Sequence, residues 1–172
     1  MRRGMGVRVV GPMQWLVWPA LAAIACTVIL ATPVHLFGLS LPEPILPLAL
    51  AFAWPLIRPS VLAPLILLAL GVFLDLFWFA PLGLWPLSLL AVYGVVLVAR
   101  SLLAGQDGRM LFAWYAACTI LAFILAYMIV SLLAGNAPSL LALFWQILPT
   151  LALFPVAAWM IEYFDDGDVR FR

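Results

Sequence analysis

The segment "GVFLDLFWFAPLGL" (residues 71–84) places one carboxylate, Asp75, inside an otherwise apolar run. Val72 to Leu74 precede it and Leu76 to Phe79 follow it, so its surroundings resemble those of a membrane-spanning helix. A polar group buried in such surroundings costs free energy unless it is hydrogen-bonded. The segment therefore indicates the class of the protein and raises the question of what holds the Asp75 carboxylate.

The composition of the whole chain is that of an integral membrane protein. Of its 172 residues, 68% are hydrophobic and 9% are charged, whereas about a quarter of the residues in soluble domains are charged. We expect one membrane domain over residues 1–172, all-α in class. The chain has no lysine and no basic cluster with interleaved aromatic residues, so we do not expect it to bind nucleic acid.

Few residues of the chain could carry catalysis or hold a metal. The two cysteines, Cys26 and Cys118, lie in apolar runs and are interpreted as small buried hydrophobic residues. A single histidine cannot supply the several ligands that a metal site needs. His35 and Glu43 share a loop and are expected to be solvated. We therefore predict no enzyme activity, no cofactor and no metal.

Three acidic residues near the C-terminus, Asp165, Asp166 and Asp168, could suggest cation binding. The full calcium-loop pattern is missing. The stretch "EYFDDGDVRFR" (residues 162–172) is therefore interpreted as a solvated, charged tail.

Six apolar runs are separated by Pro-, Gly- or charge-containing breaks. A bilayer core about 30 Å thick needs roughly 20 apolar residues in a helix. The predicted spans are residues 13–32, 41–57, 61–80, 84–103, 110–134 and 140–161. The second is short and contains Pro47 and Pro55, so it could be tilted, kinked or partly re-entrant. The first is too long for a signal peptide, and further apolar runs follow it.

The arginines support this count of spans. With the N-terminus in the cytoplasm, six spans place all eight on the cytoplasmic side, where basic residues are expected to collect. The outer connections carry only His35 and Glu43 as ionisable residues. The arginines are Arg2, Arg3, Arg8, Arg58, Arg100, Arg109, Arg170 and Arg172. We predict a multi-pass protein with both termini in the cytoplasm.

Two roles for Asp75 follow from its position before the turn "PLG" (residues 81–83). In the first, it accepts hydrogen bonds from N–H groups between Gly83 and Trp85, at the start of the next helix, which lack partners within that helix. In the second, it binds a ligand or carries a proton, because intramembrane ionisable groups are often functional. Gln146 and Tyr127 are predicted at a similar depth and are candidate hydrogen-bond partners in the bundle. The alternative is that they make local backbone or interfacial contacts.

The run "LGVFLDLFWFAPLGLWPLSLLAVYGV" (residues 70–95) resembles the central signature of the rod shape-determining protein MreD family. The resemblance covers about 26 residues; outside them only length, the number of spans and the short loops match. The matching positions are Gly71, Asp75, Pro81, Leu82, Gly83 and Tyr93.

The resemblance implies a non-enzymatic scaffold or regulatory subunit of the bacterial cell-elongation complex, which makes peptidoglycan at the inner (cytoplasmic) membrane. The implied partners are a bitopic MreC-like protein and, directly or through it, a RodA-like glycosyltransferase, a class B penicillin-binding protein and the MreB filament, besides membrane lipid. The family also resembles the S components of energy-coupling-factor vitamin transporters in fold. The alternative is therefore a small-molecule carrier subunit, which would need a cavity lined by several polar groups.

Overall fold

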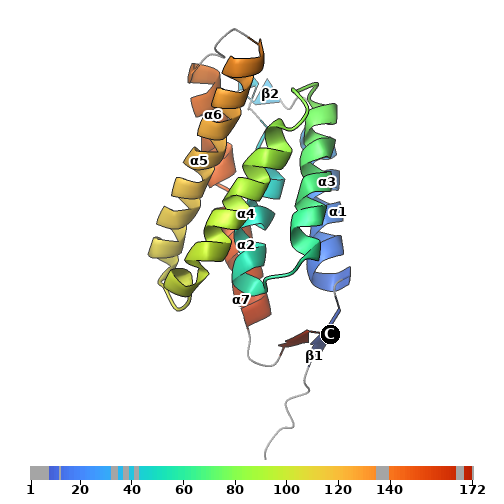
Figure 1. Cartoon of the computed structure of the whole chain (residues 1–172), viewed down its shortest axis with the longest axis vertical. Coiled ribbons are helices and arrows are strands. Elements are labelled where there is room, and N and C mark those ends of the chain that lie inside the picture. The colour runs from blue at the N-terminus through green and yellow to red at the C-terminus, as the bar shows by residue number, and fades with distance from the viewer. Residues whose placement is uncertain are drawn as a thin grey trace, which may run out of the picture.

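The computed structural model describes residues 8–11, 13–31, 35–36, 39–40, 43–134, 140–165 and 169–171. They form an elongated bundle of helices (Figure 1). The helices are η1 (Met13–Val17, a π-helical turn), α1 (Trp18–Leu30), α2 (Leu46–Ile57), α3 (Leu62–Phe77), α4 (Leu84–Leu103), α5 (Gly108–Ala134), α6 (Leu140–Leu151) and α7 (Phe154–Asp165).

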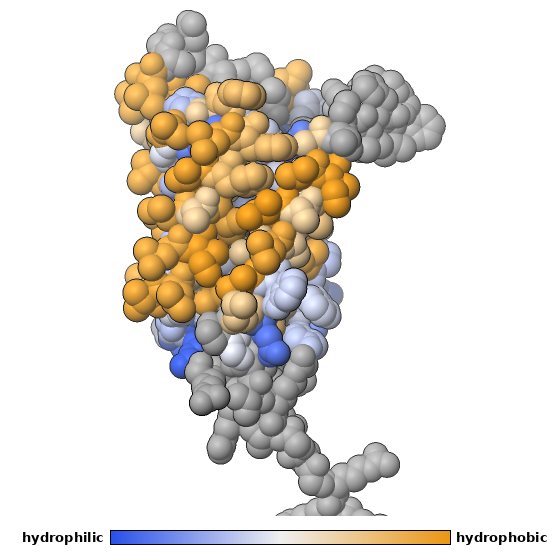
Figure 2. Space-filling view, turned by 90° about the vertical axis from the view of Figure 1, so that its right-hand side faces the viewer, coloured by the Kyte–Doolittle hydropathy of each residue, from blue (hydrophilic) through white to orange (hydrophobic). Residues whose placement is uncertain are grey.

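The helices have the length and composition of a membrane protein. Among the described residues, four helical stretches are long and apolar enough to cross a bilayer: Met13–Leu30, Leu84–Leu103, Gly108–Leu133 and Leu143–Phe164. The apolar helices α2 and α3 are shorter. Figure 2 shows the face beside α1 and α3, where apolar side chains cover most of the height and hydrophilic ones gather at the lower end.

The shortest of the predicted spans lies in the middle of the bundle. Every residue of α2 from Pro47 to Pro55 is buried, and α2 packs against α4, α7 and α1. A helix that is apolar on all sides is stable where other helices enclose it. The helix begins at Leu46 rather than at residue 41.

The structure divides the predicted sixth span, residues 140–161, into α6 and α7. The break lies at residues 152–153, just before Pro155. A proline ring has no N–H and clashes with the carbonyl four residues earlier, here that of Leu151, so one continuous helix is disfavoured. The sequence did not predict this break, although Leu143–Phe164 as a whole is long and apolar enough to cross a bilayer. The helical region also extends to Asp165, four residues beyond the predicted end.

The two ends of the described chain meet. Strand β1 (Arg8–Val10) pairs in parallel with β4 (Val169–Phe171), with Arg8 opposite Val169. Residues 169–171, which belong to the predicted solvated tail, form strand β4, while Asp166 and Asp168 lie outside the described residues. The β1–β4 pair lies at the same end of the bundle as the α2–α3 and α4–α5 connections (Figure 1).

A second strand pair, β2 (His35–Leu36) with β3 (Leu39–Ser40), is antiparallel and lies near the opposite end of the bundle. Among the described arginines, Arg8 and Arg170 lie in β1 and β4, and Arg58, Arg100 and Arg109 lie in or beside the two connections. The described arginines therefore gather at one end of the bundle.

Candidate functional site

Asp75 joins the end of α3 to the start of α4. Its Oδ2 accepts a hydrogen bond from the Gly83 N–H at 2.6 Å, and its Oδ1 accepts one from the Trp85 N–H at 3.0 Å. The side chain is only 1% exposed. Both donors belong to the stretch predicted from the sequence, so the prediction that this carboxylate holds the turn is confirmed.

The backbone of Asp75 closes the other side of the same turn. Its carbonyl accepts a hydrogen bond from the Ala80 N–H at 2.8 Å, while Phe79 adopts a left-handed conformation with φ of 54°. A left-handed residue followed by a bond of this kind is a common way to end a helix. One residue therefore ends α3 with its carbonyl and starts α4 with its carboxylate.

The remaining N–H groups in the first turn of α4 are also accounted for. The Leu84 N–H donates to the Pro81 carbonyl at 3.2 Å, and the Leu87 N–H donates to the Gly83 carbonyl at 3.1 Å. Pro86 has no N–H to satisfy. Each N–H from Gly83 to Leu87 therefore has an acceptor inside the hairpin. Gly83 has φ of 97°, a value that residues with a side chain rarely adopt.

Gly71 sets the distance between α3 and α4. A Cβ atom at this position would lie 2.4 Å from the nitrogen and 2.5 Å from the Cα of Pro86. Those atoms belong to the backbone and cannot rotate away. Glycine therefore permits a contact between the two helices that any larger residue would prevent.

The other residues of the motif, Tyr93, Pro81 and Leu82, have separate positions and contacts. The Tyr93 hydroxyl donates to the Ser60 carbonyl at 3.1 Å, which ties α4 to the connection before α3. Pro81 supplies the carbonyl that accepts the Leu84 N–H. Leu82 is 71% exposed. The structure thus brings Gly71, Asp75, Pro81 and Gly83 together in one hairpin, while Tyr93 lies midway along α4.

Gln146 does not meet Asp75. Its Nε2 donates to a backbone carbonyl, that of Glu43, at 3.5 Å, so Gln146 is not a hydrogen-bond partner of Asp75. Among the described residues, no hydrogen bond joins Tyr127 to either of them. Glu43 was expected to be solvated, but it is partly buried and its Oε2 accepts a hydrogen bond from Trp78 Nε1 at 2.7 Å.

The Glu43–Trp78 bond joins residues 35 positions apart, at the start of α2 and the end of α3. Sequence reasoning did not find it, because Glu43 lies outside residues 70–95 and Trp78 is not one of the matching positions within them. The one available signal was that the chain has few other polar groups with which Glu43 could bond.

The start of α2 is held by a side chain of another helix, as the start of α4 is held by Asp75. Thr150 Oγ1, in α6, accepts a hydrogen bond from the Ile45 N–H at the start of α2 and donates to the Gln146 carbonyl. The Thr150 carbonyl accepts from the Tyr115 hydroxyl at 2.9 Å. These bonds tie α2, α5 and α6 together with polar groups that are buried and paired.

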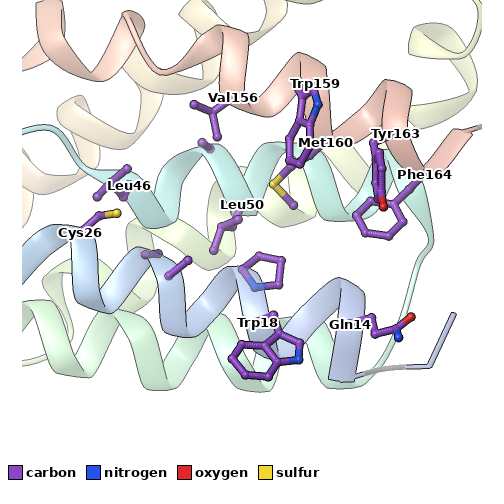
Figure 3. A pocket seen from close by; sticks show the side chains of 14 residues that line it. Gln14, Trp18, Cys26, Leu46, Leu50, Val156, Trp159, Met160, Tyr163 and Phe164 are labelled. Atoms are coloured by element: carbon purple, nitrogen blue, oxygen red, sulfur yellow. The ribbon is translucent and has the colours of Figure 1, made fainter.

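A groove of about 580 Å³ opens between α1 and α7, with α2 as its floor (Figure 3). Four of its α1 residues follow the spacing of one helix face, and all are small: Pro19, Ala22, Ala23 and Cys26. Aromatic residues line the other side, and Gln14 is its one amide. The full lining is Gln14, Trp18, Pro19, Ala22, Ala23, Cys26, Leu46, Ala49, Leu50, Val156, Trp159, Met160, Tyr163 and Phe164.

The hairpin and the groove offer packing surfaces and internal hydrogen bonds. Within the described residues, no group of three or more His, Cys, Asp or Glu side chains could hold a metal ion. Both Asp75 oxygens accept backbone hydrogen bonds, and Asp75, Glu43 and Gln146 do not line the groove. No family model, curated protein or solved structure matches the chain.

Proposed function

We propose that this chain is a non-enzymatic scaffold subunit of the bacterial cell-elongation complex in the inner membrane, like the MreD family that residues 70–95 resemble. One observation supports this most strongly: the motif residues fix the geometry of a helix hairpin. Asp75 uses both carboxylate oxygens on the backbone of α4 and the preceding turn, and Gly71 sets the contact with Pro86. A motif used in this way suits a protein that acts through the shape of its helices.

The proposed topology has six spans with both termini in the cytoplasm. The gathering of the described arginines at the end that carries β1 and β4 supports it, because cytoplasmic segments are rich in arginine. In this topology α2 and α3 are short spans. Enclosure by α4, α7 and α1 compensates for the length of α2, since it exposes little surface to lipid.

The groove between α1 and α7 is the proposed docking place for the single membrane helix of an MreC-like partner. Small residues on a helix face let a second helix approach closely, which is how helices associate in a bilayer. Pro19, Ala22, Ala23 and Cys26 provide such a face on α1. Trp18 and Trp159 flank it with large exposed side chains that are available for contact.

The lining of the same groove argues against the alternative, a carrier for a polar small molecule. Sites of that kind combine an apolar wall with several convergent polar groups. Here the amide of Gln14, the indoles of Trp18 and Trp159 and the hydroxyl of Tyr163 are the polar side-chain groups apart from the Cys26 thiol. The lining therefore favours an apolar helix as the ligand.

Affinity purification from native membranes, combined with depletion of the chain in its host, tests the proposal. A scaffold should co-purify with a single-span MreC-like protein and a class B penicillin-binding protein, and its depletion should turn rods into round cells. Rod-shaped cells that lose uptake of a vitamin after depletion would overturn the scaffold proposal and support the carrier.

A further inference from the structure

The turn between α3 and α4 is unusually apolar. Residues 76–87, "LFWFAPLGLWPL", contain no charged, hydroxyl or amide side chain. Turns that face water are rich in Asn, Asp and Ser, whose side chains bond to the local backbone. In this turn Asp75, which lies on the preceding helix, performs that role.

The side chains at the tip of this turn are uncovered. Phe79 is 96% exposed and Leu82 is 71% exposed. Phe79 also has a positive φ, which a bulky residue adopts only when its surroundings require it. The protein thus holds a large apolar side chain outward at the tip, where water would be an unfavourable neighbour.

The first helix of the hairpin is also short for a bilayer. The 16 residues of α3 span about 24 Å, less than the roughly 30 Å of a hydrocarbon core. In α4 the first charged residue is Arg100, which follows an uncharged stretch, residues 84–99. By contrast, α5 has 27 residues, and the α3–α4 turn lies below its upper end in Figure 1.

We propose that the α3–α4 turn is a lipid-inserted surface whose tip residues Phe79 and Leu82 lie in the acyl-chain layer of the leaflet they reach. Backbone groups in that layer have no water to bond, so the protein must satisfy them internally. The carboxylate and the backbone carbonyl of Asp75 accept hydrogen bonds from three N–H groups of the turn, those of Ala80, Gly83 and Trp85.

The aromatic residue at the base of the turn sets its depth. Trp78, bonded to Glu43, is a residue type that prefers the boundary between the apolar layer and the headgroups. The turn therefore lies just inside the apolar layer rather than above the headgroups.

Spin labels at single cysteines test the depth. The background is the chain with Cys26→Ala and Cys118→Ala, purified and placed in nanodiscs of phosphatidylcholine and phosphatidylglycerol without partners. Phe79→Cys and Leu82→Cys report on the turn. Ile124→Cys, exposed and midway along α5, is the lipid control, and Gln106→Cys, in the exposed α4–α5 loop, is the water control.

The ratio of collisions with oxygen to collisions with a water-soluble nickel complex gives the result. Labels at residues 79 and 82 should have ratios nearer to that of residue 124 than to that of residue 106. Ratios like that of residue 106 would overturn the proposal and would indicate a water-exposed apolar tip, available to a partner protein outside the membrane. Because both positions are exposed, neither cysteine should disturb folding.

Discussion

Gly71 lies so close to Pro86 that a Cβ atom on Gly71 would be 2.4 Å from the proline nitrogen. Gly71→Ala should therefore push α3 and α4 apart. Overpacking of this kind costs about 1–3 kcal/mol, so we expect a lower thermal unfolding midpoint in detergent and less protein in the membrane.

Gly94→Ala is the matched control for this substitution. Gly94 lies in α4, and an added Cβ would meet no described atom within 4 Å. Alanine there should stabilise the helix by about 0.5–1 kcal/mol. Equal effects of the two substitutions would show that the contact with Pro86 does not require glycine at position 71.

Both carboxylate oxygens of Asp75 should contribute to the stability of the protein. Asp75→Ala removes both bonds, each worth about 1.5–3 kcal/mol when the acceptor is charged. Asp75→Asn keeps one acceptor but turns an NH₂ group toward the N–H of Gly83 or Trp85. The asparagine variant should therefore have an unfolding midpoint between those of the wild type and the alanine variant.

The same two variants distinguish an Asp75 that is purely structural from one that also has a functional role. If Asp75 only holds the turn, then residual function in the host should follow the amount of folded protein for both variants. An asparagine variant that inserts normally, unfolds at the wild-type temperature and fails to support rod shape would assign Asp75 a role beyond the turn.

Glu43 and Trp78 form a bond that a double-mutant cycle can measure. Trp78→Phe keeps the aromatic ring and removes the Nε1 donor, and Glu43→Ala removes the acceptor. Each single change should lower stability by about 1–2 kcal/mol, and the double change should cost less than the sum. Trp159→Phe is a suitable control, since Trp159 is 59% exposed. Additive effects would mean that the 2.7 Å bond contributes nothing.

Filling the groove should block the partner without unfolding the protein. Ala22 is exposed and lines the groove, whereas Ala25 is exposed on the same helix and does not. Ala22→Leu should abolish co-purification of the single-span partner, and Ala25→Leu should leave it unchanged, with equal unfolding midpoints for the two variants. Retained partner with Ala22→Leu would move the docking surface elsewhere.

The sequence predicted most helices well because their boundaries depend on local signals. The predicted range 84–103 coincides with α4, and 61–80 and 110–134 differ from α3 and α5 by a few residues. The Asp75 bonds were also predictable, because donor and acceptor lie within ten residues of each other across an obvious turn.

What the sequence missed depends on contacts between distant residues. The pairing of Arg8 with Val169 joins residues near opposite ends of the chain, and no periodic pattern in the sequence indicates it. The bonds from Glu43 to Trp78 and from Ile45 to Thr150 likewise form only after the helices have packed. The break before Pro155 was visible in the sequence, but the strong apolar signal of residues 140–161 outweighed it.

The proposed topology predicts on which side of the membrane each end of the chain lies, and the β1–β4 pair requires both ends to lie on the same side. If both termini are cytoplasmic, a reporter fused after Arg172 should be active on the cytoplasmic side, and one inserted within residues 135–138 should be active on the outer side. Since β1 pairs with β4, a reporter at the N-terminus should match the one after Arg172. Reporters at residues 135–138 and 172 on the same side would mean that α6 and α7 together do not cross, leaving an odd number of spans. The parallel pairing of the two ends makes that outcome hard to reach, because strands on opposite sides of a bilayer cannot hydrogen-bond.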